Sequence, residues 1–109
     1  MDYKYGRFTP QQMAAAKQYM RKKIYFLLVC VDPETSKGCK DVDVPSAFDN
    51  ILREFGGLNE LLFNPPELVQ VMSSLEAALL EYKSQDFEFQ NYRRLVLDAG
   101  ARVLRIKEV

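Results

Sequence analysis

The sequence contains no histidine and only two cysteines among its 109 residues. Histidine is the commonest general base in enzymes and the commonest protein ligand of transition metals. Two cysteines without any histidine cannot complete the four-ligand set of a structural zinc site. The composition therefore argues against enzymatic activity, and it predicts neither a metal nor another cofactor.

The two cysteines, Cys30 and Cys39, lie nine positions apart. A disulfide between them is conceivable, but free thiols are the usual state in a cytosolic chain. Cys30 belongs to an apolar run, which should raise its pKa and make it unreactive. Cys39 lies between Lys37 and Lys40 and should be the more reactive thiol, although no base is evident beside it.

The chain also lacks long apolar stretches. None approaches the ~20 consecutive apolar residues of a membrane-spanning helix. The N-terminal sequence MDYKY has no apolar signal-peptide core, so we expect a cytoplasmic location. With 48% hydrophobic and 28% charged residues, the chain is expected to form one globular domain over residues 1–109.

Helical periodicity dominates the sequence. A capping box of Thr9, Pro10 and Gln12 predicts the start of a helix that continues to residue 31. Its last part, residues 24–31, is apolar throughout and could instead form a buried strand paired with residues 40–44. The unbroken pattern from Pro10 onward favours the helix.

Further helices are expected over residues 45–55, 64–83 and 87–106, with a short helical turn over 58–63. Gly56-Gly57 should stop the second helix, and Asn64 and Asp86 should cap the two that follow. The broad apolar face of residues 64–83 is typical of a central helix covered by several neighbours. Gly100 should permit close approach of another helix.

These elements predict an all-α fold, a compact helical bundle of four main helices plus one short helix. Residues 1–8 are too short to fold as an element of their own. We expect them to lie as an N-terminal arm, with three aromatic side chains available to pack against the body: Tyr3, Tyr5 and Phe8.

Charge is unevenly distributed although the net charge is zero. Residues 1–31 carry six basic residues and one acidic residue, whereas residues 32–60 carry seven acidic and three basic ones. Acidic residues on helix surfaces often serve solubility alone, but a cluster can also orient a basic partner. The candidate partner-binding residues are Asp41, Asp43, Asp49, Glu54 and Glu60.

Basic residues near the two ends of the chain offer an alternative, a small DNA- or RNA-binding regulator. Asp98 lies four positions from both Arg94 and Arg102, and it should bridge them and weaken their attraction for phosphate. The candidate nucleic-acid contacts are Lys17, Arg21, Arg94, Arg102 and Arg105. A third possibility is a structural subunit that oligomerises through an apolar face near Phe63 or Tyr25.

Three segments carry a family resemblance: DYKYGRFTP at residues 2–10, GGLNELL at 56–62 and YRRLVLDAGA at 92–101. They resemble small proteins carried by prophages and integrative elements of gut Firmicutes, over nearly the whole chain. Some proteins of that setting are anti-CRISPR proteins, which inhibit RNA-guided nucleases. The resemblance implies a non-enzymatic protein–protein interaction module whose partner is such a nuclease.

Overall fold

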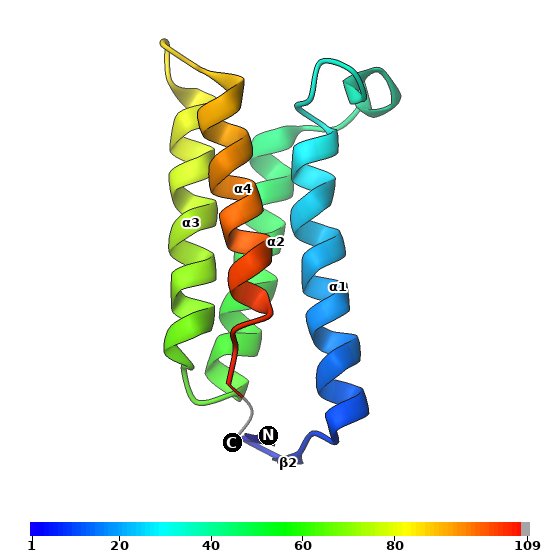
Figure 1. The fold of residues 1–109 in the computed structure, drawn as a ribbon, viewed down its shortest axis with the longest axis vertical. Coiled ribbons are helices and arrows are strands. Elements are labelled where there is room, and N and C mark those ends of the chain that lie inside the picture. The colour runs from blue at the N-terminus through cyan, green and yellow to red at the C-terminus, as the bar shows by residue number, and fades with distance from the viewer. Residues whose placement is uncertain (108–109) are drawn as a thin grey trace.

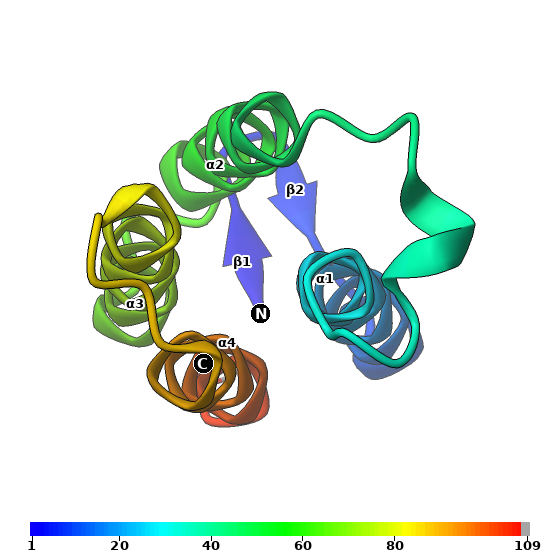
Figure 2. The same ribbon diagram turned by 90° about the horizontal axis from the view of Figure 1, so that it is seen from above.

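Four helices form an up-down-up-down bundle. The computed structural model describes the backbone of residues 1–107 and every side chain among them except that of Ser36. The helices are α1 (Pro10–Val29), α2 (Val44–Leu61), α3 (Pro66–Lys83) and α4 (Phe89–Val103). Successive helices run in opposite directions (Figure 1), and seen from above they surround a common core (Figure 2). The predicted all-α bundle is confirmed.

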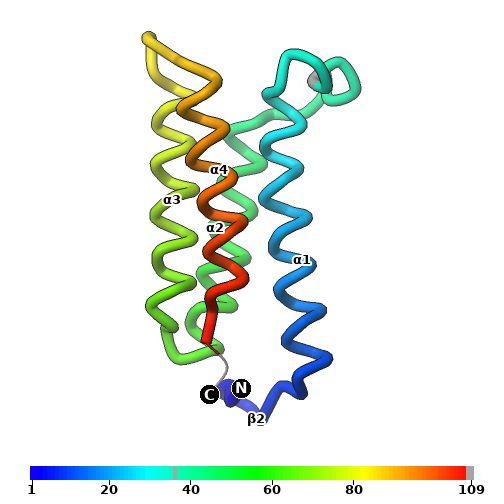
Figure 3. The backbone as a smooth tube through the Cα atoms, viewed as in Figure 1, coloured from blue at the N-terminus to red at the C-terminus, as the bar shows by residue number. Residues whose placement is uncertain are grey.

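The first helix is continuous, so the strand interpretation of residues 24–31 is wrong. Its start has the predicted capping box. The Thr9 hydroxyl accepts a hydrogen bond from the Gln12 backbone N–H at 3.1 Å, and the Gln12 side chain accepts one from the Thr9 N–H at 2.9 Å. The helix ends at Val29, where a long connection with a short 3-10 turn, η1 (Ser36–Cys39), begins. Figure 3 shows this connection projecting beyond the helix ends.

The N-terminal arm has more structure than expected. Its two strands, β1 (Asp2–Tyr3) and β2 (Gly6–Arg7), form a small hairpin at the end of the bundle where α1 begins (Figure 1). Tyr3 stacks on Phe8 with ring centroids 4.4 Å apart, and the Lys4 N–H donates to the Leu61 carbonyl at 2.8 Å. The two strands pair over only two residues each, and these contacts keep the hairpin in place against the bundle.

The predicted stop at Gly56-Gly57 is wrong, because α2 runs through both glycines to Leu61. The expected separate turn at 58–63 is therefore mostly the last part of α2. Each glycine costs a helix about 1 kcal/mol relative to alanine. Burial of Phe55 and Leu62 on either side of the pair offsets that cost.

Two predicted caps are also wrong. Asn64 has a φ of 56° and follows Phe63 at 63°, so both residues form a left-handed turn, and Pro65 occupies the cap position of α3. The Asn64 N–H donates instead to the carbonyl of Asn59 at 2.8 Å, closing the end of α2. At the next turn, Glu88 rather than Asp86 precedes α4.

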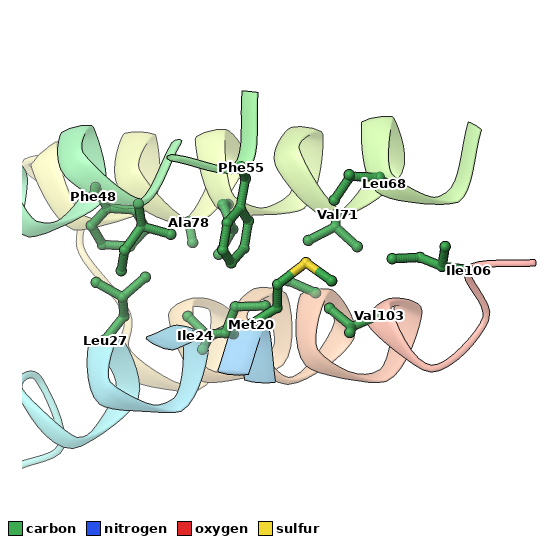
Figure 4. Close-up of a cluster of buried hydrophobic side chains, with 14 of the residues drawn as sticks. Met20, Ile24, Leu27, Phe48, Phe55, Leu68, Val71, Ala78, Val103 and Ile106 are labelled. Carbon is green, nitrogen blue, oxygen red and sulfur yellow. The ribbon is translucent and has the colours of Figure 1, made fainter. Parts of the chain in front are cut away.

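The core is built from one stripe of each helix. Figure 4 shows Met20, Ile24 and Leu27 of α1 facing side chains from the other three helices. Within residues 1–107, the buried side chains are all apolar or aromatic. Helix α3 also buries only a single stripe, and its Leu80 is 71% exposed, so the prediction that α3 is a central helix is wrong. A ring of four helices has no central member.

Gly100 confirms the expected close approach. A methyl group at this position would lie 2.8 Å from the Tyr25 ring of α1, which occupies the space that a side chain would take. In addition, the buried Tyr92 hydroxyl of α4 donates to the Leu27 carbonyl of α1 at 2.6 Å. Helix α1 is thus joined to α4 at two places.

None of the helices in the described part of the chain is both long and apolar enough to cross a membrane.

Substitution Gly100→Ala should lower the free energy of unfolding by about 1–3 kcal/mol, because the Tyr25 ring must move. Gly57→Ala is the matched control, since nothing lies within 4 Å of its added methyl group. It should raise stability by about 0.5–1 kcal/mol through helix propensity. Urea unfolding followed by circular dichroism measures both, and a Gly100→Ala protein as stable as the Gly57→Ala protein would contradict the packing.

Candidate protein-interaction surface

Four of the five acidic candidates belong to α2 or cap it. Asp43 is the cap residue, and its carboxylate accepts a hydrogen bond from the Ser46 N–H at 3.2 Å. Asp49, Glu54 and Glu60 follow along the helix, and Asp41 precedes it. All five are exposed. From Asp43 to Glu60 the helix rises about 25 Å, so the candidates are spread along α2 rather than gathered in a compact patch. At 3.6 residues per turn, Asp43 and Glu54 lie on one side of α2 and Asp49 and Glu60 on another; we refer to the candidates together as the acidic edge of α2.

This acidic edge has partners at two places. Asp49 forms an ion pair with Arg53 one turn later, at 3.0 Å. Glu54 accepts a hydrogen bond from the Tyr19 hydroxyl of α1. This hydrogen bond is the main reason why the pKa of Tyr19 is raised above its ordinary value. Glu54 is therefore turned toward α1, whereas Asp41 and Glu60 have no side-chain partner among the described residues.

The structure adds a groove that sequence analysis missed. It has a volume of about 420 Å³ and lies between α1 and α2. Its apolar walls are formed by Ala16, Tyr19, Met20, Phe55, Leu58 and Leu61. Gly57 keeps it open because it has no side chain. The only sign of this groove in the sequence was an excess of apolar residues outside the core stripes. That excess does not show that α1 and α2, which are distant in sequence, come together to form a groove.

The two edges of this groove differ in charge. On the α1 edge, the Lys23 ammonium lies 5.4 Å from the centre of the Tyr19 ring. On the α2 edge, Glu54 lines the groove. Tyr19 is 45% exposed, so a large amphipathic ring stands between the basic and the acidic edge. A partner lying here would meet apolar surface below and opposite charges at its sides.

The basic candidates are divided between two surfaces. Lys17 and Arg21 line a second groove, between α1 and α4. Arg102 instead faces α3: it donates to Gln70 of that helix and to Asp98 of its own helix, both at 2.8 Å. Arg94 is exposed on α4, Arg105 is exposed in the turn after α4, and neither residue lines a groove. The five residues therefore do not form one surface for a nucleic-acid duplex.

The Asp98 carboxylate of α4 accepts hydrogen bonds from two side chains. It accepts hydrogen bonds from the Arg102 side chain and, at 2.8 Å, from the Ser74 hydroxyl of α3. The hydrogen bond from Arg102 is the main cause of a pKa below the usual aspartate value. The expected bridge is therefore formed with Arg102, and no bond to Arg94 is present in the described part of the chain.

Both cysteines are free thiols, with Cys30 buried and Cys39 half-buried. Burial, followed by a hydrogen bond with Cys39, raises the pKa of Cys30 to about 12. The direction agrees with the prediction from its apolar surroundings. Across residues 1–107, no cluster of three or more acidic or cysteine side chains is arranged to hold a metal ion.

Comparison of the chain with protein-family models, with curated proteins and with solved structures finds no match. The site must therefore be interpreted from its own geometry.

The ion pair of Asp98 predicts a dependence of stability on pH. Its pKa is lower in the folded than in the unfolded protein, so its contribution is present above the unfolded value of about 3.9 and is lost as pH falls toward the folded value. The stability difference between wild type and Asp98→Asn should shrink as pH falls from 7 to below about 4. Urea midpoints measured across this range would show it.

Glu76→Gln is the control for this series, because Glu76 is exposed on α3 and has no partner in the described structure. A difference between wild type and Asp98→Asn that stays constant with pH would contradict the role of Asp98.

Proposed function

We propose that the protein is a non-enzymatic protein–protein interaction module that binds a basic partner through α2 and the adjoining α1–α2 groove. The observation that carries this proposal is the combination of an apolar groove of about 420 Å³ with the acidic edge of α2. Apolar surface supplies most of the free energy of association, while complementary charge speeds encounter and fixes orientation.

The occupant that fits this groove is an amphipathic helix of the partner. A groove between two antiparallel helices is a common receptor for such a helix, which places its apolar face on the groove floor. A lysine or arginine residue on one side of the occupant would face Glu54. The basic α1 edge, marked by Lys23, disfavours the reversed orientation because like charges would then meet.

The partner class that we favour is an RNA-guided nuclease of the host. Such enzymes hold nucleic acid in a positively charged channel, and an acidic helix edge about 25 Å long could occupy part of that channel. The resemblance to mobile-element proteins of gut Firmicutes supports the same assignment. The protein would then act as an anti-CRISPR inhibitor, blocking the nuclease by occupancy.

Charge reversal tests the acidic edge. The triple variant Asp41→Lys, Asp49→Lys and Glu60→Lys spares Asp43, which caps α2, and Glu54, which binds Tyr19. Inhibition of DNA cleavage by the guide-loaded host nuclease should weaken about a hundredfold, because each reversed charge faces a basic surface. The melting temperature should stay close to that of the wild type.

The matched control reverses Glu76 and Asp86, two exposed carboxylates away from α2. This control variant should inhibit DNA cleavage to the same extent as the wild type. If the folded triple variant inhibits cleavage as strongly as the wild type, the acidic edge does not contact the nuclease.

The groove is tested separately through Tyr19→Ala. Truncating an aromatic anchor in a binding groove typically costs at least 2 kcal/mol of affinity, about thirtyfold. Tyr5→Ala, on the hairpin, removes a ring that is 75% exposed and lies outside the groove, so it serves as the control. Binding measured by surface plasmon resonance should fall for Tyr19→Ala alone; identical affinities for the two variants would exclude the groove.

A further inference from the structure

A second groove lies on the other side of α1, facing α4. Its volume is about 580 Å³. It is lined by Ala14, Lys17, Gln18, Arg21, Lys22, Tyr25 and Leu104. Among the described residues this lining contains three cationic side chains and no carboxylate, in a protein whose net charge is zero. The groove is thus a local concentration of positive charge beside apolar surface.

Arg21 is the unusual residue of this groove. Its side chain is half-buried, and its guanidinium donates one hydrogen bond, to the Tyr25 hydroxyl at 2.8 Å. The Nε atom is buried without a partner, and no carboxylate among the described residues pairs with the group. Arginine is rarely buried unless it is paired with an anion. The guanidinium therefore keeps N–H donors from which a bound anion could accept.

The guanidinium is held in place rather than free to move into solvent. It lies 5.3 Å from the centre of the Tyr25 ring, in a cation–π contact. The Tyr25 ring in turn packs against the backbone of α4 at Gly100, where no side chain intervenes. Gly100, Tyr25 and Arg21 thus form a stack that orients the charged group before any ligand arrives, which lowers the entropic cost of binding.

The other two cations extend the positive surface. The Lys17 ammonium donates to the Ile106 carbonyl at 2.9 Å, so it is engaged with the C-terminal side of α4. Lys22 is exposed at the edge of the groove. Arg21 and Lys22 together suit a doubly charged group better than a single carboxylate, and the planar arginine matches phosphate oxygens in particular.

We propose that the α1–α4 groove binds the phosphate group of an organic ligand, with Arg21 as its main contact. The volume lies within the range of small-molecule sites. Ala14, Leu104 and the Tyr25 ring provide apolar surface for the remainder of the ligand. The phosphate can come from a nucleotide-sized molecule or from a nucleic-acid backbone, since the groove recognises the same group in both. The proposal is independent of the α2 surface.

The test is a titration of the ¹⁵N-labelled full-length protein at low salt, followed by NMR. The three probes are inorganic phosphate, adenosine monophosphate and a short single-stranded oligonucleotide. Chemical-shift changes should be confined to the residues of the α1–α4 groove. Arg21→Gln, which keeps a side chain able to donate to Tyr25, should weaken binding at least tenfold, as expected for loss of a charge-assisted hydrogen bond.

Arg94→Gln is the matched control, because Arg94 is an exposed arginine of α4 outside the groove. It should bind like the wild type. If the Arg21→Gln protein does not fold, Lys22→Glu takes its place and should weaken binding severalfold, since Lys22 is exposed and its replacement places a negative charge at the groove edge.

Tighter binding of adenosine monophosphate than of inorganic phosphate would support the site and assign it to small ligands. Oligonucleotide binding that weakens steeply with salt would support it with a nucleic-acid backbone as the source. Absence of shifts in the groove with all three probes would overturn the proposal. Unchanged affinity in the folded Arg21→Gln and Lys22→Glu variants would also overturn it.

Discussion

The attachment of α1 to α4 is the contact on which the rest of this structure depends. Tyr25 fills the space left by Gly100, and the buried Tyr92 hydroxyl holds the Leu27 carbonyl. Helix α1 also contributes side chains to the common core, and a hairpin precedes it and a long connection follows it. Because α1 is drawn toward α4, it leaves an apolar groove along α2 and orients Arg21 on its opposite side. Both candidate sites follow from this one packing arrangement.

The topology also converts a charge pattern along the chain into a charge pattern across the molecule. The basic segments contain α1 and α4, which are far apart in sequence but neighbours in the bundle (Figure 2). The acidic middle of the chain contains α2 and α3, which form the other half. The protein is neutral overall yet has two sides of opposite sign, so a charged partner meets it in a preferred orientation. The proposed phosphate groove lies on the basic side, and the proposed protein surface begins on the acidic side.

Sequence reasoning succeeded where local signals and packing agree, and it failed where they compete. The capping box at Thr9 set the start of α1, and the all-α class followed from helical periodicity. The predicted helix end at Gly56-Gly57 was wrong, because core contacts on both sides of the pair outweigh the cost of two glycines within a helix. For the site, the acidic residues could be assigned to one segment, but the Tyr19–Glu54 contact joins residues 35 positions apart. Both grooves arise from such distant pairings, which periodicity does not encode.

Helix α1 forms one wall of each groove, and this shared wall has a thermodynamic consequence. The two grooves lie on opposite sides of the same rigid element, so a shift of α1 that narrows one of them widens the other. A ligand that draws α1 toward α4 would therefore change the affinity of a partner helix beside α2. Linkage then requires that the partner change the affinity for the ligand by the same factor. Two sites that share no residue can in this way regulate each other through the position of a single helix.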